Sequence, residues 1–178
     1  MGDRRGFTLV EAMIVVALIG ITAGIGGAYL LTQLPSMRVN GATRQLVGDL
    51  RLAKTLAVET GDEVYLVFDV AQNEYQVVRD SDHNDAYDAG SDEVLKTVRL
   101  PETHRGIEFY AHSGVPGGEV TFGADVAEFT PRGTADTGSV YLRPANDAGV
   151  RDDRQRRVTV VGSTGRAKAW RWDGADWV

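Results

Sequence analysis

The chain contains no cysteine among its 178 residues. This absence excludes disulfide bonds, thiolate-bound zinc, a cysteine nucleophile and a lipoprotein anchor. Proline is scarce, with 5 residues against 21 glycines, which favours a turn-rich β domain over a helical bundle. Positive charge is also in deficit, because the formal net charge is −6. A general nucleic-acid-binding surface is therefore not expected, and any basic site has to be local.

Charge of either sign is absent from Ala12 to Leu31, and this run is long enough to span a bilayer as one helix. Arg4 and Arg5 precede the run, so the positive-inside rule predicts a cytoplasmic N-terminus with everything after Leu34 on the other side of the membrane. A cleaved secretory signal is not favoured, because the run leaves through YLLTQLP, which offers no small-x-small cleavage site.

One carboxylate, Glu11, stands near the start of this apolar run. A charge in a membrane helix costs about 2.5–3.5 kcal/mol at the helix centre, so acids in this position usually have a partner and a function. The alternative is a glutamate whose side chain only reaches the membrane interface.

The letters GFTLVE, from Gly6 to Glu11, resemble the class III signal of type IV prepilins and pseudopilins. The resemblance implies that a membrane prepilin peptidase cuts after Gly6 and that Phe7 becomes the N-methylated first residue. Residues 1–6 would then be a removed leader peptide. It also implies that Glu11 pairs with the α-amine of a neighbouring subunit, a type of buried pair that specifies register and partner.

Glycines are concentrated in GITAGIGG, from Gly20 to Gly27. They fit a small-xxx-small helix contact between Gly20 and Gly24, or a segment that unwinds when subunits pack in a filament. They also fit the general abundance of glycine in membrane helices. Pro35 follows and predicts the membrane exit and a kink.

The segment from Ser36 to Thr60 has helical spacing, and Gly61 is a suitable stop. Its apolar stripe, which needs a sheet to pack on, is formed by Leu46, Leu50, Ala53 and Ala57. The charged side chains predicted to lie elsewhere on the helix surface are Arg44, Asp49, Arg51 and Glu59.

The remainder of the chain predicts strands separated by Gly, Pro, Asp and Asn. The predicted strand segments are EVYLVFDV, EYQVVRD, EVLKTVRL, GIEFYA, VYLRP, RRVTVVG and AKAWRW. The fold class is therefore α+β, with a long N-terminal helix on an antiparallel β domain, divided between two small sheets. The expected organisation is a leader (1–6), a transmembrane or filament-core helix (7–34), an amphipathic half-helix (35–61) and a periplasmic β domain (62–178).

The C-terminal pattern EFTPRGTADTGSVYLR followed by RRVTVVGSTGRAKAW resembles the GspH/FimT group of minor pseudopilins and minor pilins. The residues that match this group are Phe129, Pro131, Gly133, Gly165 and Arg166. The resemblance implies a pilin-like fold and a non-enzymatic structural role. It also implies pilin or pseudopilin subunits, an inner-membrane assembly platform and the prepilin peptidase as partners.

Catalytic motifs are not evident in the sequence. The three histidines, His83, His104 and His112, have no HExxH spacing, and no Gly-x-Ser-x-Gly elbow or Walker lysine is present. We therefore expect no enzyme and no resident cofactor.

The acidic stretch RDSDHNDAYDAGSDEV offers a calcium site as an alternative. Asp80, Asp82, Asn84 and Asp88 fall at positions one, three, five and nine of an EF-hand-like loop. The pattern then fails, because Asp85 replaces the turn glycine. The competing interpretation is a solvated hairpin loop whose Asp and Asn side chains cap turns.

The tail GRAKAWRWDGADWV offers a nucleic-acid site. On a strand, Arg166, Lys168, Trp170 and Trp172 would share one face, where cations grip phosphates and rings stack on bases. GRAK also resembles the G-R-x-R tail motif through which FimT-type minor pilins of competence systems bind DNA. A tryptophan pair on a strand is otherwise core or subunit interface. The nearby RDDRQRR could extend a basic patch, or its aspartates could cancel it.

The sequence thus predicts a single-pass protein of the bacterial inner membrane, with its C-terminal domain in the periplasm until assembly into a filament. The leading function is a minor pseudopilin that helps to prime and assemble the pseudopilus of a type II secretion system. The alternatives are a FimT-like minor type IV pilin that binds DNA for natural transformation, and a calcium-stabilised adhesive or structural pilin.

Overall fold

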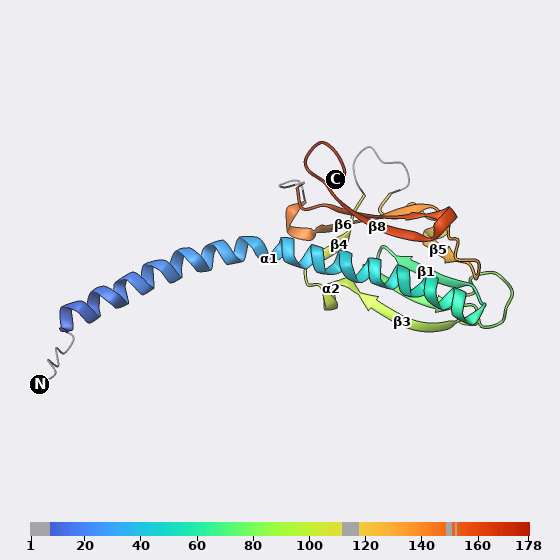
Figure 1. The fold of residues 1–178 in the computed structure, drawn as a ribbon, viewed down its shortest axis with the longest axis horizontal. Coiled ribbons are helices and arrows are strands. Elements are labelled where there is room, and N and C mark those ends of the chain that lie inside the picture. Colours follow the sequence, from blue (N-terminus) through green and yellow to red (C-terminus); the bar gives the residue numbers. More distant parts are fainter. Residues whose placement is uncertain (1–7, 112–117, 149–150, 152) are drawn as a thin grey trace, which may run out of the picture. The chain divides into compact units, whose positions relative to one another are not determined.

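The computed structural model describes residues 8–111, 118–148, 151 and 153–178. The chain divides into two compact units, residues 1–34 and 35–178. The helix α1, Leu9–Thr60, runs through both of them (Figure 1). The predicted leader peptide, Gly6 and Phe7 lie outside the described residues.

The first unit presents an apolar, exposed part of α1. Its large hydrophobic side chains between Leu9 and Leu31 are 46–77% exposed. By length and composition, α1 is the one helix among the described residues that could cross a membrane. The hydroxyl of Thr22 donates to the carbonyl oxygen of Leu18 at 2.8 Å, so this polar group is satisfied within the helix. The helix continues past Pro35, and the kink there stays a prediction.

The second unit packs the amphipathic half of α1 on the β domain. The predicted apolar stripe is confirmed, because Leu46, Leu50, Ala53 and Ala57 are all fully buried. The helix ends at Thr60. Gly61 has a φ of +81°, and its N–H donates to the carbonyl oxygen of Ala57 at 3.1 Å. This left-handed conformation is the reason a glycine stops the helix here.

The predicted position of Asp49 on the exposed helix surface is wrong. The residue is buried, with only 5% exposure. Its carboxylate accepts a hydrogen bond from the Tyr75 hydroxyl at 2.7 Å and from Lys96 Nζ at 2.6 Å. A charged residue on the inner side of the helix is tolerated because both oxygens have partners on the sheet.

The β domain consists of two four-stranded antiparallel sheets, as predicted. The first has the order β3-β2-β1-β5 and the second β4-β6-β7-β8. The strands are β1 (Val64–Asp69), β2 (Glu74–Arg79), β3 (Glu93–Arg99), β4 (Ile107–Phe109), β5 (Val126–Phe129), β6 (Gly138–Pro144), β7 (Arg156–Val161) and β8 (Arg166–Arg171). The short helices are α2 (Leu100–Thr103) and the 3-10 turns Gly123–Asp125, Ala145–Asp147 and Gly162–Thr164.

β5 is missing from the predicted strands, and it lies in a different sheet from the strands before and after it in the chain. It pairs with β1, while β4 before it and β6 after it belong to the second sheet. The chain therefore passes from one sheet to the other and back. The core lies between α1 and the two sheets, and it includes a ring cluster in which Phe68 contacts Tyr75, Phe109 and Phe122 at centroid distances of 5.9–6.1 Å.

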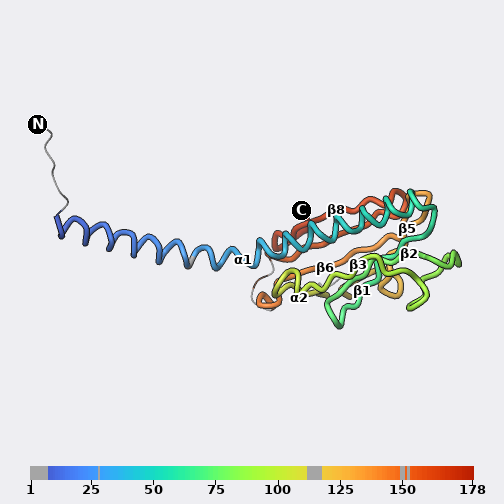
Figure 2. The backbone as a smooth tube through the Cα atoms, turned by 90° about the horizontal axis from the view of Figure 1, so that it is seen from below, coloured from blue at the N-terminus to red at the C-terminus, as the bar shows by residue number. Residues whose placement is uncertain are grey.

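Figure 2 shows the second half of α1 beside β8, at the edge of the second sheet. Every residue of the hydrophobic core cluster, from Val39 to Ala167, belongs to the unit 35–178. This unit therefore carries its own complete core and is expected to fold without the apolar N-terminal segment.

Candidate functional site

Glu11 is exposed in the first turn of α1. Its backbone N–H donates a hydrogen bond to the hydroxyl of Thr8 at 3.3 Å. No described cation lies within ion-pair distance of its carboxylate. A partner for Glu11 therefore has to come from outside the described residues, which agrees with the predicted pairing to another subunit without testing it.

The loop between β2 and β3 is organised around Asp80, which is fully buried. Its two carboxylate oxygens accept the backbone N–H groups of His83 at 2.7 Å and of Asp85 at 2.9 Å. Burial alone would raise the pKa of Asp80, but these hydrogen bonds outweigh it and hold the pKa below its usual value. His83 and Asp85 both have positive φ, so the loop is a tight turn wrapped around one carboxylate.

The predicted calcium ligands are only partly brought together. Asp80 and Asp82 lie with Asp92, and one carboxylate oxygen from each falls within 4.8 Å of the others. Loss of solvation and the hydrogen bond with Asp80 raise the pKa of Asp82. Asn84 and Asp88 lie outside this set of three carboxylates, and Asn84 Nδ2 donates to Asp88 Oδ2 at 2.6 Å and to Asp82 Oδ2 at 3.2 Å.

Asp92 is the member of this cluster that an EF-hand spacing misses. Its oxygens accept the N–H groups of Ser81 at 3.3 Å and of Asp88 at 2.8 Å, which closes the loop at its second end. The oxygen-rich set of Asp80, Asp82 and Asp92 suits calcium chemistry. Both oxygens of Asp80 and of Asp92 already accept backbone hydrogen bonds, however, so the same carboxylates also satisfy the loop by themselves.

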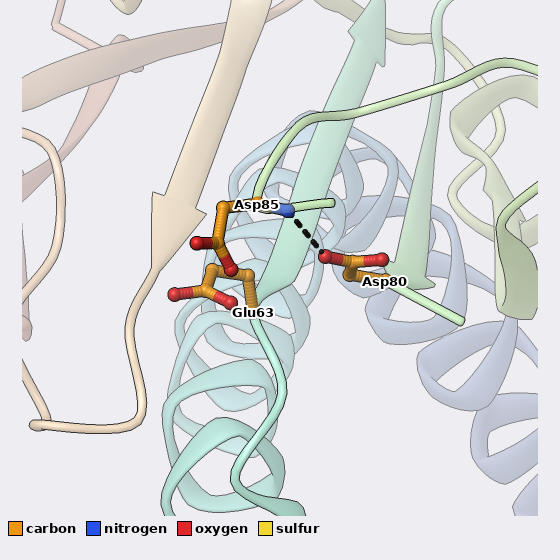
Figure 3. Close-up of side chains that lie close together, drawn as sticks. All are labelled: Glu63, Asp80 and Asp85. Atoms are coloured by element: carbon orange, nitrogen blue, oxygen red, sulfur yellow. Dashed lines mark hydrogen bonds between the residues drawn. The ribbon is translucent and has the colours of Figure 1, made fainter. Parts of the chain in front are cut away.

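Figure 3 shows a second carboxylate group, formed by Asp80 with Glu63 and Asp85. The side chains of Glu63 and Asp85 lie against each other, and the backbone nitrogen of Asp85 points to Asp80. Burial and the hydrogen bond with Asp85 raise the pKa of Glu63.

The tail residues Arg166, Lys168 and Trp170 share one face of β8, as predicted. Lys168 Nζ lies 3.3 Å from the centroid of the Trp170 ring, and Arg157 of β7 lies 5.4 Å from it. The π-face expected to stack on a base is therefore engaged by the chain's own cations. Trp172 lies one residue beyond the end of β8 and pairs with Trp177 in an isolated antiparallel bridge.

Trp177 is not among the predicted site residues, but it folds back onto the side of the sheet that carries Trp170 and Arg157. It lies 5.3 Å from Trp172 and 5.6 Å from Tyr141 between ring centroids. Gly174, with a φ of +105°, makes the turn between Trp172 and Trp177. The D-G pair in WDGADW is the signal that predicts such a hairpin.

The arginine-rich RDDRQRR is divided between the two alternatives. Arg156 and Arg157 lie beside the tail, because Arg156 lines a cavity with Arg171 and Arg157 lies over the Trp170 ring. Arg151, in contrast, pairs with Asp153 at 2.8 Å, and Arg154 pairs with Asp147 at 3.4 Å. The cancelling alternative is therefore correct for Arg151 and Arg154. Asp152 lies outside the described residues.

A groove separates α1 from β8 and is called the α1/β8 groove below. It consists of two adjoining cavities of about 380 and 410 Å³, both lined by Thr43, Arg44 and Ala169. Neither cavity has an Asp or Glu among its described lining residues. The cations that line it are Arg44, Arg51, Arg156, Arg166, Lys168 and Arg171.

The described histidines do not form a catalytic group. His104 Nε2 lies 2.7 Å from Gln45 Oε1 on α1, and His83 Nδ1 lies 3.5 Å from Asp62 in a different part of the domain. His112 lies outside the described residues.

Two family models match the chain. The model of the type II transport protein GspH matches residues 42–165, and that of the prokaryotic N-terminal methylation motif matches residues 1–27. The chain is also similar to the type II secretion system protein H of Xanthomonas campestris pv. campestris, with 24% identity over 119 residues, 65% of this chain and 69% of that protein.

Solved structures with similarity to the chain include two minor pilin-like proteins. One is the minor pseudopilin EpsH of the Vibrio cholerae type 2 secretion system, with 14% identity and a TM-score of 0.46 over 78% of this chain and 99% of that chain. The other is the type IV minor pilin FimU of Pseudomonas aeruginosa, with 11% identity and a TM-score of 0.48 over 79% and 92% of the two chains.

Proposed function

The chain belongs to the GspH family, and on this premise we propose that it is a minor pseudopilin that helps to prime and assemble the pseudopilus of a type II secretion system. The match over residues 42–165 is the observation that carries this proposal. The match of residues 1–27 to the N-terminal methylation motif supports it independently, because it covers a different part of the chain.

The proposal includes cleavage and N-methylation at the predicted positions. The prepilin peptidase removes residues 1–6 by cutting after Gly6, and Phe7 becomes the N-methylated first residue. Glu11 then neutralises the α-amine of a neighbouring subunit in the filament, because neither charge is stable alone in an apolar bundle. Its exposure on α1 and its lack of a described cationic partner support this assignment.

Before assembly the chain is held in the inner membrane by the first part of α1. The apolar composition of this segment supports a single span. The N-terminus lies in the cytoplasm and the unit 35–178 in the periplasm, an orientation supported by Arg4 and Arg5. The partners are other pseudopilin subunits, the inner-membrane assembly platform and the prepilin peptidase, and the role is structural.

DNA capture by a FimT-like minor type IV pilin is the alternative function. Arg166 and Lys168 are exposed on β8, which supports a local phosphate-binding site. Lysine at position 168 lacks the bidentate fork of arginine, and Trp170 already contacts Lys168 and Arg157. These contacts favour the secretion role over base stacking.

A deletion of the gene separates the two functions. The secretion role predicts that substrates of the type II system accumulate in the periplasm and that natural transformation is unchanged. The wild-type gene and an Arg166→Ala/Lys168→Ala double variant should both restore secretion. Loss of transformation with intact secretion, restored by the wild type alone, would replace this function with DNA capture.

A further inference from the structure

β8 is the edge strand of its sheet, and its outer edge faces the α1/β8 groove. β7 pairs along one side of β8, and no other strand of the described sheet pairs along the second side. The N–H of Trp172 donates to the carbonyl oxygen of Gln155 at 3.2 Å, in the same register as the β7–β8 ladder. Backbone groups of the even-numbered β8 residues therefore point to β7, and those of the odd-numbered residues point to the groove.

One odd-numbered residue of β8 already has a strand partner on this outer edge. The N–H of Arg171 donates to the Val178 oxygen at 2.7 Å, and the N–H of Val178 donates to the Arg171 oxygen at 2.9 Å. Such a reciprocal pair is the unit of an antiparallel ladder. The next two pairing positions along the same edge are Ala169 and Ala167, which both line the groove.

The charge of the groove defines what can enter it. Arg156 is only 8% exposed, and its guanidinium is held by the side-chain oxygen of Asn40 at 2.9 Å and the carbonyl of Gln155 at 2.8 Å. Burial and the neighbouring Arg171 lower the pKa of Arg156. No described carboxylate lies within 4.0 Å of Arg44, Arg156 or Arg171.

A buried arginine without a carboxylate is costly, and it becomes favourable when an anion enters beside it. The groove therefore combines an unfilled strand edge with cations on both of its walls, α1 and β8, in a chain of net charge −6.

We propose that the α1/β8 groove binds an extended acidic segment of a partner protein, which adds to the second sheet as a strand along the outer edge of β8. The segment continues the ladder that Val178 begins and exchanges backbone hydrogen bonds with Ala169 and Ala167. Main-chain bonds supply affinity, and alternate carboxylate side chains supply specificity. Carboxylates on the helix side meet Arg44 and Arg156, since alternate residues of a strand point to opposite faces.

The binding test uses the unit 35–178, which holds the whole core, and a labelled peptide of alternating Val and Asp. A Val-Lys peptide of equal length is the charge control. The expected result is salt-sensitive binding of the Val-Asp peptide that weakens about tenfold in Arg44→Glu. Arg132→Glu makes the same charge change on an exposed residue outside the groove and should leave the affinity unchanged.

The strand-addition step is tested separately with Ala169→Pro. Proline removes the N–H that points to the groove and leaves the bonds to β7 in place, which is why proline is tolerated at sheet edges. Binding should be lost in this variant and kept in Ala169→Ser. Should Ala169→Pro fail to fold, amide hydrogen exchange of the wild type gives the same information, because the peptide should protect Ala167 and Ala169.

Three outcomes overturn the proposal. Binding that is unchanged in Ala169→Pro, or without protection of the two amides, shows a contact made by charge alone. Tighter binding of a single-stranded DNA oligonucleotide than of the Val-Asp peptide, also weakened by Arg44→Glu, assigns the groove to nucleic acid. No binding of the peptide at low salt removes the acidic segment as the occupant.

Discussion

The Asp49 carboxylate on α1 accepts a hydrogen bond from the Tyr75 hydroxyl of β2 at 2.7 Å, at a point where both side chains are buried. Lys96 of β3 binds the other oxygen of Asp49 at 2.6 Å. Burial and the bond to Asp49 raise the pKa of Tyr75, so the hydroxyl stays a donor. One helical acid thus joins α1 to two strands of the first sheet.

Asp49→Ala should lower the free energy of unfolding of the unit 35–178 by about 1–3 kcal/mol, because it leaves the buried Tyr75 hydroxyl without its acceptor. The Lys96 side chain is 38% exposed, so its charge can still be solvated. Urea denaturation measures this change. Glu59→Ala, on an exposed position of the same helix, is the matched control and should change stability by less than about 0.5 kcal/mol. Equal losses in both variants would remove Asp49 as a tie between helix and sheet.

Gly162 is expected to tolerate no side chain. A Cβ there would lie 2.6 Å from the carbonyl oxygen of Ala135 and 2.5 Å from the hydroxyl of Thr137. The N–H of Ala135 donates to the Gly162 oxygen at 2.8 Å, so the backbones must approach closely at this point. Gly162→Ala should therefore destabilise the domain by about 1–3 kcal/mol in thermal or urea unfolding.

Gly48 on α1 is the matched control for Gly162, because a Cβ there meets nothing within 4 Å. Alanine has higher helix propensity, so Gly48→Ala should stabilise the domain by about 0.5–1 kcal/mol. A stabilising Gly162→Ala would contradict the close approach.

We expect the burial of His104 to make the domain less stable in mild acid. Burial lowers the pKa of His104 below its ordinary 6.5. The unfolded chain therefore binds a proton at a higher pH than the folded chain, so the stability due to neutral His104 is complete above about pH 6.5 and is lost as the pH falls toward the folded pKa. Melting temperatures between pH 7 and pH 5 should show a decline that is weaker in His104→Gln. The same substitution at the exposed His83 should keep the decline, and equal declines in wild type and His104→Gln would exclude this cause.

Calcium at the β2–β3 loop stays a prediction with a direct test. EDTA should lower the melting temperature of the unit 35–178, and added Ca²⁺ should restore it. Asp82→Asn should abolish this response and change the EDTA-treated protein little, since Asp82 is exposed whereas Asp80 and Asp92 hold the loop. An unchanged melting temperature in EDTA would leave the loop as a turn closed by its own hydrogen bonds.

The periodic spacing of apolar residues in the sequence predicts the long helix and most of the strands. Leu46, Leu50, Ala53 and Ala57 were predictable because their spacing depends only on neighbours along α1. Asp49 was not, since its burial depends on Tyr75 and Lys96, which come from distant strands. β5 is not among the predicted strands because it has only four residues, too few to show a clear alternation. It directly follows a turn at Ala124 and Asp125, which both have positive φ.

The candidate sites divide in the same way. The shared face of Arg166, Lys168 and Trp170 follows from strand alternation and was predictable. The α1/β8 groove was not predictable, because Arg44 and Arg171 come to line the same cavity only when the sheet packs on the helix. Likewise, Asp92 joins Asp80 and Asp82 through the folded loop and not through EF-hand spacing.

A minor pseudopilin is cut, methylated and inserted into a filament, so the mass of the mature protein tests the proposed function most directly. Mass spectrometry of the chain purified from cells that contain the prepilin peptidase should show a polypeptide that begins at N-methylated Phe7. An intact chain that still begins at Met1, or one cut after the apolar run, would contradict the assignment as a pseudopilin.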